Sequence, residues 1–154
     1  MPERLTADID DDFVVFLIGM HVNRWRSVRS WGPVFRAMPA MLAELRAKPE
    51  LGLLKAYQGW MFGGPAVVQY WRSFEQLVAY SRDSGSEHLP AWRKFNRLIA
   101  HTQAVGIWHE TYEVSAGQWE AIYADMPAVG LMGAVGSRSL NAESTADTRL
   151  QTRA

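Results

Sequence analysis

The feature that most constrains the fold is an uninterrupted apolar run near the start of the chain, FVVFLIGMHVN, residues 13–23. It is rich in β-branched residues and contains no Asp, Glu, Lys or Arg, a pattern typical of a central strand covered on both faces. Gly19 inside such a strand indicates a bulge or the close approach of a bulky group. The run is far shorter than the roughly 20 residues of a membrane-spanning helix, so we expect a buried strand.

The next elements follow from apolar spacing and turn residues. Residues 34–48 show helical spacing, and Pro39 predicts a joint in this helix because the residue before a proline is disfavoured in the α region. Residues 51–62 and 65–73 flank Gly63–Gly64. A glycine pair between two apolar runs predicts a β-hairpin.

The chain after residue 73 contains three predicted helices and a strand. Pro90 suits a first helical turn, so one helix begins near Leu89. The β-branched and aromatic residues of Val105–Val114 predict a strand. Two shorter helices are expected over 74–82 and 118–125. The order is therefore strand, helix, hairpin, helix or helix pair, and strand.

This order predicts the fold class. Two right-handed β-α-β crossovers give an α+β protein of ferredoxin-like topology, with one antiparallel four-stranded sheet and its helices on one face. All four strands are rich in apolar residues on both faces. Because the second face of the sheet then needs a cover, we expect a homodimer.

We expect one domain between two loose ends. A chain of 154 residues fits a single domain, placed at 12–134. Residues 1–11 are acidic towards their end and have little to bury, which predicts a flexible arm. Residues 135–154 are mostly polar, and this composition predicts a disordered tail.

Charge and cysteine content exclude several function classes. Sixteen basic and 16 acidic residues give no net charge, so no field of the whole molecule attracts nucleic acid. The absence of cysteine excludes disulfides, thiolate nucleophiles and cysteine-bound metals. No leader or membrane span is recognisable. We therefore expect a soluble, cytoplasmic protein with neither nucleic acid nor membrane as a partner.

One segment departs from this neutral composition. Residues 24–36 contain four arginines and no acid, interleaved with Trp25, Trp31 and Phe35. Such a pattern can stack on single-stranded nucleic acid, although zero net charge argues against that partner. An anion-tolerant rim at the mouth of a pocket is a better interpretation, and a plain solvated surface is better still.

A pocket between helices and sheet is the predicted functional site. Seven tryptophans are many for this length, and large aromatic side chains either fill a core or line a pocket. The candidate substrate-binding residues are Gln69, Trp71, Trp92, Trp108, Glu110 and Tyr112, and the candidate catalytic residues are His88, Asn96 and His109. A buried Asn96 can equally find backbone partners, and each histidine can equally be held by structural hydrogen bonds.

Strand alternation also divides these candidates. Side chains alternate along a strand, so His109 is predicted on one face of Val105–Val114, with Trp108, Glu110 and Tyr112 on the other. Both faces mix apolar and polar residues. We therefore expect one face to pack on helices and the other on a second sheet or a ligand.

Other kinds of site lack a motif. The glycines at 130, 133 and 136 do not lie between a strand and a helix, so no phosphate-binding loop is predicted. No nucleophile elbow accompanies a Ser–His–Asp set. His101, His109 and Glu110 do not match the ligand spacing of a closed metal site, so we predict no bound metal.

Six segments of the chain resemble one known family. They are Ile18–Trp25, Pro49–Leu54, Val68–Ser73, His88–Arg93, Phe95–Asn96 and Val105–Tyr112. They are similar to the monooxygenase-like family named for a fumagillin-pathway member, and the similarity extends from about Asp12 to Gly133. The resemblance implies a dimeric α+β barrel, a superfamily that includes cofactor-free quinone-forming monooxygenases, haem-degrading enzymes and haem-dependent aldoxime dehydratases.

The resemblance leads to a functional hypothesis, a small oxidoreductase that oxidises an apolar or aromatic metabolite as a monooxygenase without a cofactor. In such a mechanism the substrate is deprotonated, and its carbanion passes an electron to oxygen. We predict His88 or His109 as the base and Asn96 as the partner of the enolate. The alternatives are a haem enzyme with one of these histidines as axial ligand and a non-catalytic small-molecule-binding module.

Overall fold

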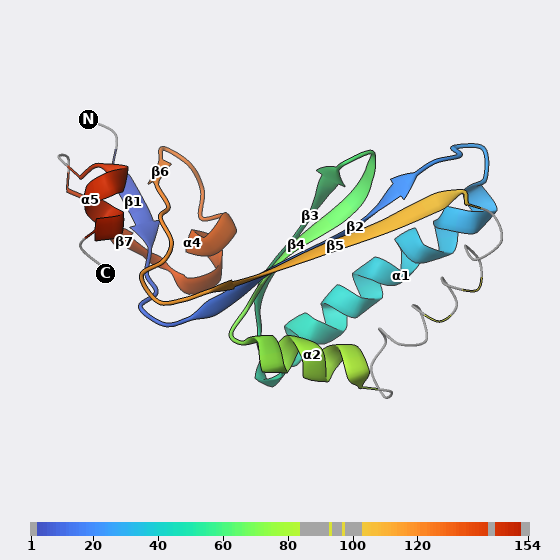
Figure 1. Ribbon diagram of the computed structural model, residues 1–154, viewed down its shortest axis with the longest axis horizontal. Helices are drawn as coiled ribbons and strands as arrows, with labels where there is room; N and C mark the ends of the chain where they lie inside the picture. Colours follow the sequence, from blue (N-terminus) through green and yellow to red (C-terminus); the bar gives the residue numbers. More distant parts are fainter. Residues whose placement is uncertain (1–2, 84–92, 94–96, 98–102, 142–143, 152–154) are drawn as a thin grey trace.

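The computed structural model describes residues 3–83, 93, 97, 103–141 and 144–151. Its main layer is a four-stranded antiparallel sheet in the order β3-β4-β2-β5. Helices α1 (Val28–Ala47) and α2 (Phe74–Arg82) lie on one face of it (Figure 1). The strands are β2 (Phe13–Val22), β3 (Leu53–Met61), β4 (Gly64–Trp71) and β5 (Val105–Val114). The predicted α+β, ferredoxin-like arrangement is confirmed.

Alternate residues of β2 build the core beneath the helices. Val14, with Phe16 and Ile18 beside it, packs against Leu42 and Leu45 of α1. Burying a side chain of this size contributes about 1.5–3 kcal/mol. A slip of one residue in the pairing of β2 would turn this set to the other face, so the core also fixes the register of the sheet.

Helix α1 begins earlier than predicted and continues without a joint. It is a single helix that contains both Pro33 and Pro39, although a proline inside a helix removes a hydrogen bond. Trp31, in its first turns, packs against a buried cluster at the end of the sheet that includes Met20 and Val105. This tertiary contact stabilises turns that the prolines alone would disfavour.

Helix α2 agrees with its predicted range of 74–82. Ser73 caps it, because the Ser73 Oγ accepts a hydrogen bond from the Gln76 N–H at 3.2 Å. A short 3-10 helix, η1 (Pro49–Leu51), precedes β3. The helix predicted from near Leu89 lies outside the described residues, except for Arg93 and Arg97, which are helical. Among the helices that the structure describes, none has the length and apolar content to cross a membrane.

The turn between β3 and β4 falls one residue earlier than predicted. Phe62 and Gly63 form it, and both have a positive φ, 51° and 81°, as a two-residue hairpin turn requires. Gly64 instead begins β4. A Cβ built on Gly64 would lie 1.8 Å from the carbonyl oxygen of Met20. The second glycine therefore allows the hairpin to approach the backbone of β2.

A second, smaller lobe replaces the predicted arm, the predicted tail and the predicted helix over 118–125. Its sheet has the order β6-β1-β7 and pairs the two ends of the chain, since Leu5 lies opposite Ser139. We call this unit the small lobe. Its elements are β1 (Arg4–Ala7), β6 (Tyr123–Ala124), α4 (Gly130–Val135), β7 (Ser137–Ser139) and α5 (Ala146–Gln151).

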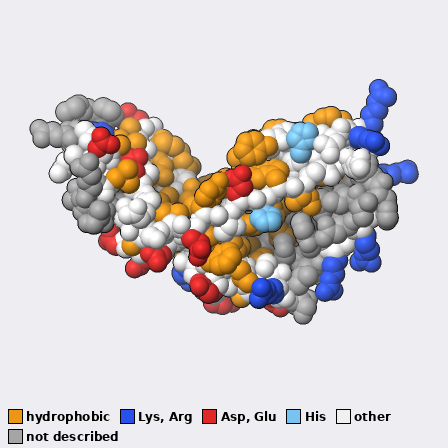
Figure 2. Space-filling view, viewed as in Figure 1, with side chains coloured by type: hydrophobic (Ala, Val, Ile, Leu, Met, Phe, Trp, Pro, Cys, Tyr) orange, Lys and Arg blue, Asp and Glu red, His pale blue; other side chains and the backbone are white. Residues whose placement is uncertain are grey.

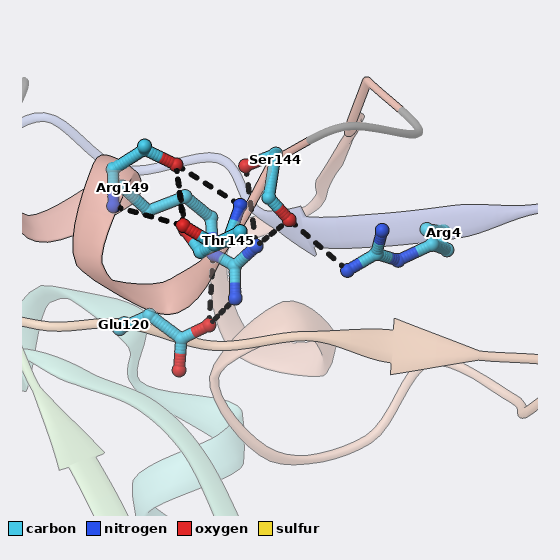
Figure 3. A network of polar contacts seen from close by, with 6 residues as sticks. Arg4, Glu120, Ser144, Thr145 and Arg149 are labelled. Carbon is cyan, nitrogen blue, oxygen red and sulfur yellow. Dashed lines mark hydrogen bonds and ion pairs between the residues drawn. The ribbon is translucent and has the colours of Figure 1, made fainter.

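Charged side chains hold the small lobe together. Arg138 of β7 forms ion pairs with Asp8 at 3.5 Å and Asp10 at 3.0 Å. In α5, the Arg149 Nε donates to the Glu120 Oε1 at 2.8 Å, and its Nη1 donates to the Ser144 carbonyl at 2.8 Å (Figure 3). Polar residues at both ends of the chain are thus ordered by partners that lie far away in the sequence.

The small lobe packs on the face of the main sheet that the helices leave uncovered. Phe13 of β2 lies among Ala7, Trp119 and Leu131 in a second buried cluster. The rings of Phe13 and Trp119 meet edge to face, with their centroids 6.3 Å apart. The lobe therefore covers one end of this face with residues of the same chain.

We predict that Gly64→Ala lowers the free energy of unfolding by about 3 kcal/mol. Its new methyl group meets backbone, which cannot rotate away, so β4 must move from β2. Gly59→Ala on β3 is the matched control, because nothing lies within 4 Å of a Cβ there, and its effect should stay within about 0.5 kcal/mol. Urea unfolding measures both, and equal losses would contradict the close approach.

Candidate functional site

The sheet divides the predicted site residues into two groups. Gln69, Trp71 and His109 face the helices, and Trp108, Glu110 and Tyr112 lie on the opposite face, which we call the open face. Trp71 belongs to the core beneath α1 and α2, whereas Trp108 packs over Gly19. The remaining candidates, His88, Trp92 and Asn96, lie outside the described residues. The two groups cannot line one pocket within a single subunit.

Trp71 and Gln69 are structural partners in the core. Trp71 is fully buried, and its indole N–H donates to the Gln69 Oε1 at 2.8 Å. The Trp71 ring also packs against Tyr80 of α2, with centroids 5.9 Å apart. Because the indole N–H and the amide oxygen satisfy each other, this pair stabilises the frame of the site.

His109 is the described histidine of β5, and its side chain lies on the face of the sheet that the helices cover. It lies opposite Ile18 in the sheet, and its ring centroid is 5.9 Å from that of Phe16. The side chain is exposed and forms no hydrogen bond with any residue that the structure describes. Within that part of the chain, both ring nitrogens are therefore available to a ligand.

Trp108 lies flat against the open face. A Cβ on Gly19 would lie 2.8 Å from the Trp108 Cζ2, so the close approach predicted at this glycine is confirmed. Phe62 at the hairpin turn meets the Trp108 ring at 4.8 Å. The Trp108 N–H is buried and has no hydrogen-bond partner among the described residues. The ring thus forms one end wall of the open face.

Glu110 and Tyr112 form a hydrogen-bonded pair beside this wall. The Tyr112 hydroxyl donates to the Glu110 Oε2 at 2.6 Å, and both side chains are exposed. The hydrogen bond and the negative charge of Glu110 both favour the protonated phenol, which raises the pKa of Tyr112 above its ordinary value. The pair offers a carboxylate and a phenol to a ligand or to a partner surface.

Three tyrosines that are not among the predicted site residues close the other end of the open face. The Tyr57 hydroxyl donates to the Gly130 carbonyl at 3.3 Å, and the Tyr123 hydroxyl accepts from the Met132 N–H at 3.3 Å. The rings of Tyr57 and Tyr70 meet at 6.4 Å. Burial raises the pKa of both, and the neighbouring Tyr123 adds to the effect. These contacts fix α4 against β3 and β4.

A hollow separates the two end walls. Tyr57, Val68, Leu17 and Glu110 follow one another across the four strands on the open face. Figure 2 shows the surface hollowed between the small lobe and the hairpin, with hydrophobic side chains gathered there. The open face is therefore an apolar trough with an acidic group at one side.

His21, the other described histidine, has structural partners. Its Nδ1 lies 2.9 Å from the Asn23 Oδ1, and the Asn23 Nδ2 donates to the Gln103 carbonyl at 3.1 Å. A Cβ on Gly63 would lie 2.6 Å from the imidazole. Within the described ranges, no three His, Asp or Glu side chains come together in a way that could hold a metal ion.

The chain matches the model of one protein family over residues 13–131, and this family is described as monooxygenase af470-like. The range agrees closely with the segments that carry the resemblance in the sequence. No protein with a curated description matches the chain.

Solved structures give a more distant likeness. A dimeric protein of unknown function with a ferredoxin-like fold from Bacteroides fragilis is 15% identical, with a TM-score of 0.46, over 66% of this chain and 95% of that one. SnoaB, a cofactor-independent oxygenase from Streptomyces nogalater, is 14% identical, with a TM-score of 0.45, over 66% and 91%. A dimeric ferredoxin-like protein from an uncultured marine organism is 18% identical, with a TM-score of 0.39, over 68% and 95%.

We predict that Glu110→Gln lowers the pKa of Tyr112 towards its ordinary value of 10.0, because the amide carries no negative charge to disfavour the phenolate. An NMR pH titration of the labelled tyrosine ring measures the change. Glu113→Gln removes the same charge from a neighbouring position on the opposite face and should leave the pKa of Tyr112 unaltered. Equal effects of both substitutions would show a general charge effect in place of the specific pair.

Proposed function

The chain belongs to the monooxygenase af470-like family, and we propose that it is a cofactor-independent monooxygenase acting on an apolar or aromatic metabolite. Membership of this family supports an oxidoreductase of the oxygenase type. The substrate class, the lack of a cofactor and the roles of individual residues are our proposal.

The position of His109 is the observation that carries this proposal. Its imidazole stands on the helix-facing side of β5 beside an aromatic ring, that of Phe16, and has no hydrogen-bond partner among the described residues. An imidazole can accept a proton near neutral pH, and an aromatic neighbour favours a flat, apolar substrate. We propose His109 as the base. His88 as an alternative base, Trp92 as a binding residue and Asn96 as the partner of the enolate remain proposals.

The proposed reaction balances with oxygen as the only co-reactant. His109 takes a proton from an acidic CH₂ group of the substrate, and the resulting carbanion gives one electron to O₂. The substrate radical and superoxide then combine through a new C–O bond to form a peroxide, which the imidazolium protonates. Loss of the second C–H proton and cleavage of the O–O bond release water. One CH₂ and one O₂ thus yield one carbonyl and one H₂O.

The residues of the open face receive a different role in this proposal. Trp108, Glu110 and Tyr112 lie across the sheet from His109, and Leu17 and Val68 beside them leave an apolar surface. Monomers rarely expose large continuous apolar patches. We therefore propose that a second copy of the chain covers the open face in a homodimer.

We predict that His109→Ala slows oxygen consumption roughly 10²- to 10⁴-fold, the usual contribution of a general base. The assay uses an oxygen electrode and a panel of polycyclic aromatic ketones and phenols with acidic protons, and mass spectrometry follows ¹⁸O from ¹⁸O₂ into the product. His21→Gln is the matched control, because that histidine is held by Asn23, and it should keep the wild-type rate. A rate that depends on added haemin, or a His109 variant of normal activity, would contradict the proposal.

We predict that Leu17→Glu converts the dimer into a monomer, because the new carboxylate lies at the centre of the apolar trough and loses its hydration in the interface. Light scattering coupled to size-exclusion chromatography measures the mass. Ala79→Glu, on the exposed side of α2, makes a similar apolar-to-acidic change and should leave the dimer intact. A wild-type protein that is monomeric at every concentration would exclude the dimer while leaving the role of His109 open to the oxygen assay.

A further inference from the structure

Aromatic side chains gather unburied at the end of the sheet where β2 leads into α1. Trp25, in this connection, stacks on Trp60 of β3 with ring centroids 5.6 Å apart and an interplanar angle of 15°. These two side chains are 56% and 58% exposed. Trp25 also meets Trp31 edge to face at 6.4 Å. Trp31 therefore supports the stacked pair, and both indole rings remain exposed to solvent.

The first turns of α1 follow Trp25 in the chain and carry two further exposed apolar residues. Val28 and Phe35 are both more than half exposed. They are seven residues apart in one helix, so they lie on the same helical face. We call these residues and the stacked pair the aromatic end. Single exposed apolar residues are common, but Trp25, Val28 and Phe35 are exposed within one stretch of 11 residues, and Trp60 is stacked on Trp25, which indicates a docking surface.

The aromatic end is also the basic end of the molecule. The arginines of residues 24–36 are exposed and form no ion pair with a residue that the structure describes: Arg24, Arg26, Arg29 and Arg36. Asp10, Asp11 and Asp12 precede β2, at the other end of that strand. The ten residues of β2 separate the two charge clusters by about 30 Å. On the face shown in Figure 2, most of the visible Lys and Arg side chains lie at one end, and most of the visible acidic side chains lie away from it.

We infer that the aromatic end docks on a lipid surface that carries negative charge. Indole rings favour the interface between water and lipid, and arginines are attracted to anionic headgroups within a Debye length. Val28, an aliphatic residue in the patch, can enter a lipid layer but cannot stack on a base. The stacked indoles cover one face of each other, which leaves a single free face on each ring for a nucleotide. A lipid surface therefore fits this combination better than a single-stranded nucleic acid.

This docking does not depend on the proposed reaction. The residues of the aromatic end differ from His109 and from those of the trough. It also requires no membrane-spanning helix, since an apolar patch with surrounding cations is sufficient for peripheral attachment. The expectation that the protein has no membrane partner rests on the lack of a recognisable leader and of a membrane span, and neither of these addresses a local surface.

The test is flotation of the full chain with vesicles. We expect the protein to float with vesicles of phosphatidylcholine and phosphatidylglycerol and to stay behind with phosphatidylcholine alone, and we expect high salt to release it. Arg24→Gln with Arg26→Gln should weaken partitioning by roughly fivefold for each charge removed. Trp25→Ser with Trp60→Ser should weaken it further and reduce the quenching of tryptophan fluorescence by brominated lipid.

Matched controls come from other surfaces. Arg46→Gln with Arg82→Gln removes two exposed cations, and Phe74→Ser removes an exposed ring elsewhere; both variants should float like the wild type. Circular dichroism checks that each variant is folded. If the variant with both tryptophans replaced is unstable, the variant with Arg24 and Arg26 replaced still tests the inference, because these two side chains are exposed. Equal flotation of the wild type with neutral and anionic vesicles would overturn the inference. Control variants that float as poorly as the variant with Arg24→Gln and Arg26→Gln would also overturn it. So would tighter binding of a single-stranded oligonucleotide that vesicles cannot displace.

Discussion

Strand β2 has to bury apolar side chains on both of its faces, and the rest of the structure depends on how that is done. The helices α1 and α2 cover Val14 and its neighbours on one side. On the other side the small lobe covers Phe13 at one end, and Trp108 packs directly over Gly19 further along. Helices cover one face, whereas the small lobe and Trp108 cover only parts of the other. This difference underlies our proposal that the reaction takes place on the helix side and that a second copy of the chain covers the open face.

Local periodicity was sufficient to predict the elements of the main sheet and its topology. The run of β2, the hairpin and α2 each satisfy a rule that spans only a few residues. The start of α1 was predicted too late, because the packing of Trp31 against Met20 and Val105 involves residues that no local rule includes. The small lobe was not predicted for the same reason. The aspartates before β2 and Arg138 are far apart in the sequence, and each resembles a solvated surface residue unless their ion pairs are known.

Sequence periodicity predicted the faces on which the candidate residues of β5 lie, but not how the candidate residues are arranged relative to one another. Alternation along β5 correctly placed His109 and Trp108 on opposite faces of the sheet. The expected pocket nevertheless included both, because its residues were chosen by their chemical type and not by their face. Trp71 shows the same difficulty. A tryptophan on a strand can line a pocket or fill a core, and the available signal was Gln69, two residues away on the same face and able to accept from the indole. The tyrosine cluster depends on β6 and α4, so it could not be found without the small lobe.

The zero net charge of this protein does not describe the local charge of its surface, for a physical reason. Charges act over a Debye length of about 8 Å at physiological ionic strength, whereas β2 holds the acidic and basic clusters about 30 Å apart. The aspartates therefore do not cancel the field of the arginines near the aromatic end. Asp10 is also paired with Arg138, while the arginines beside Trp25 have no acidic partner in the described part of the chain. A neutral chain folded in this way presents a locally cationic surface, and its partners must be inferred from that surface.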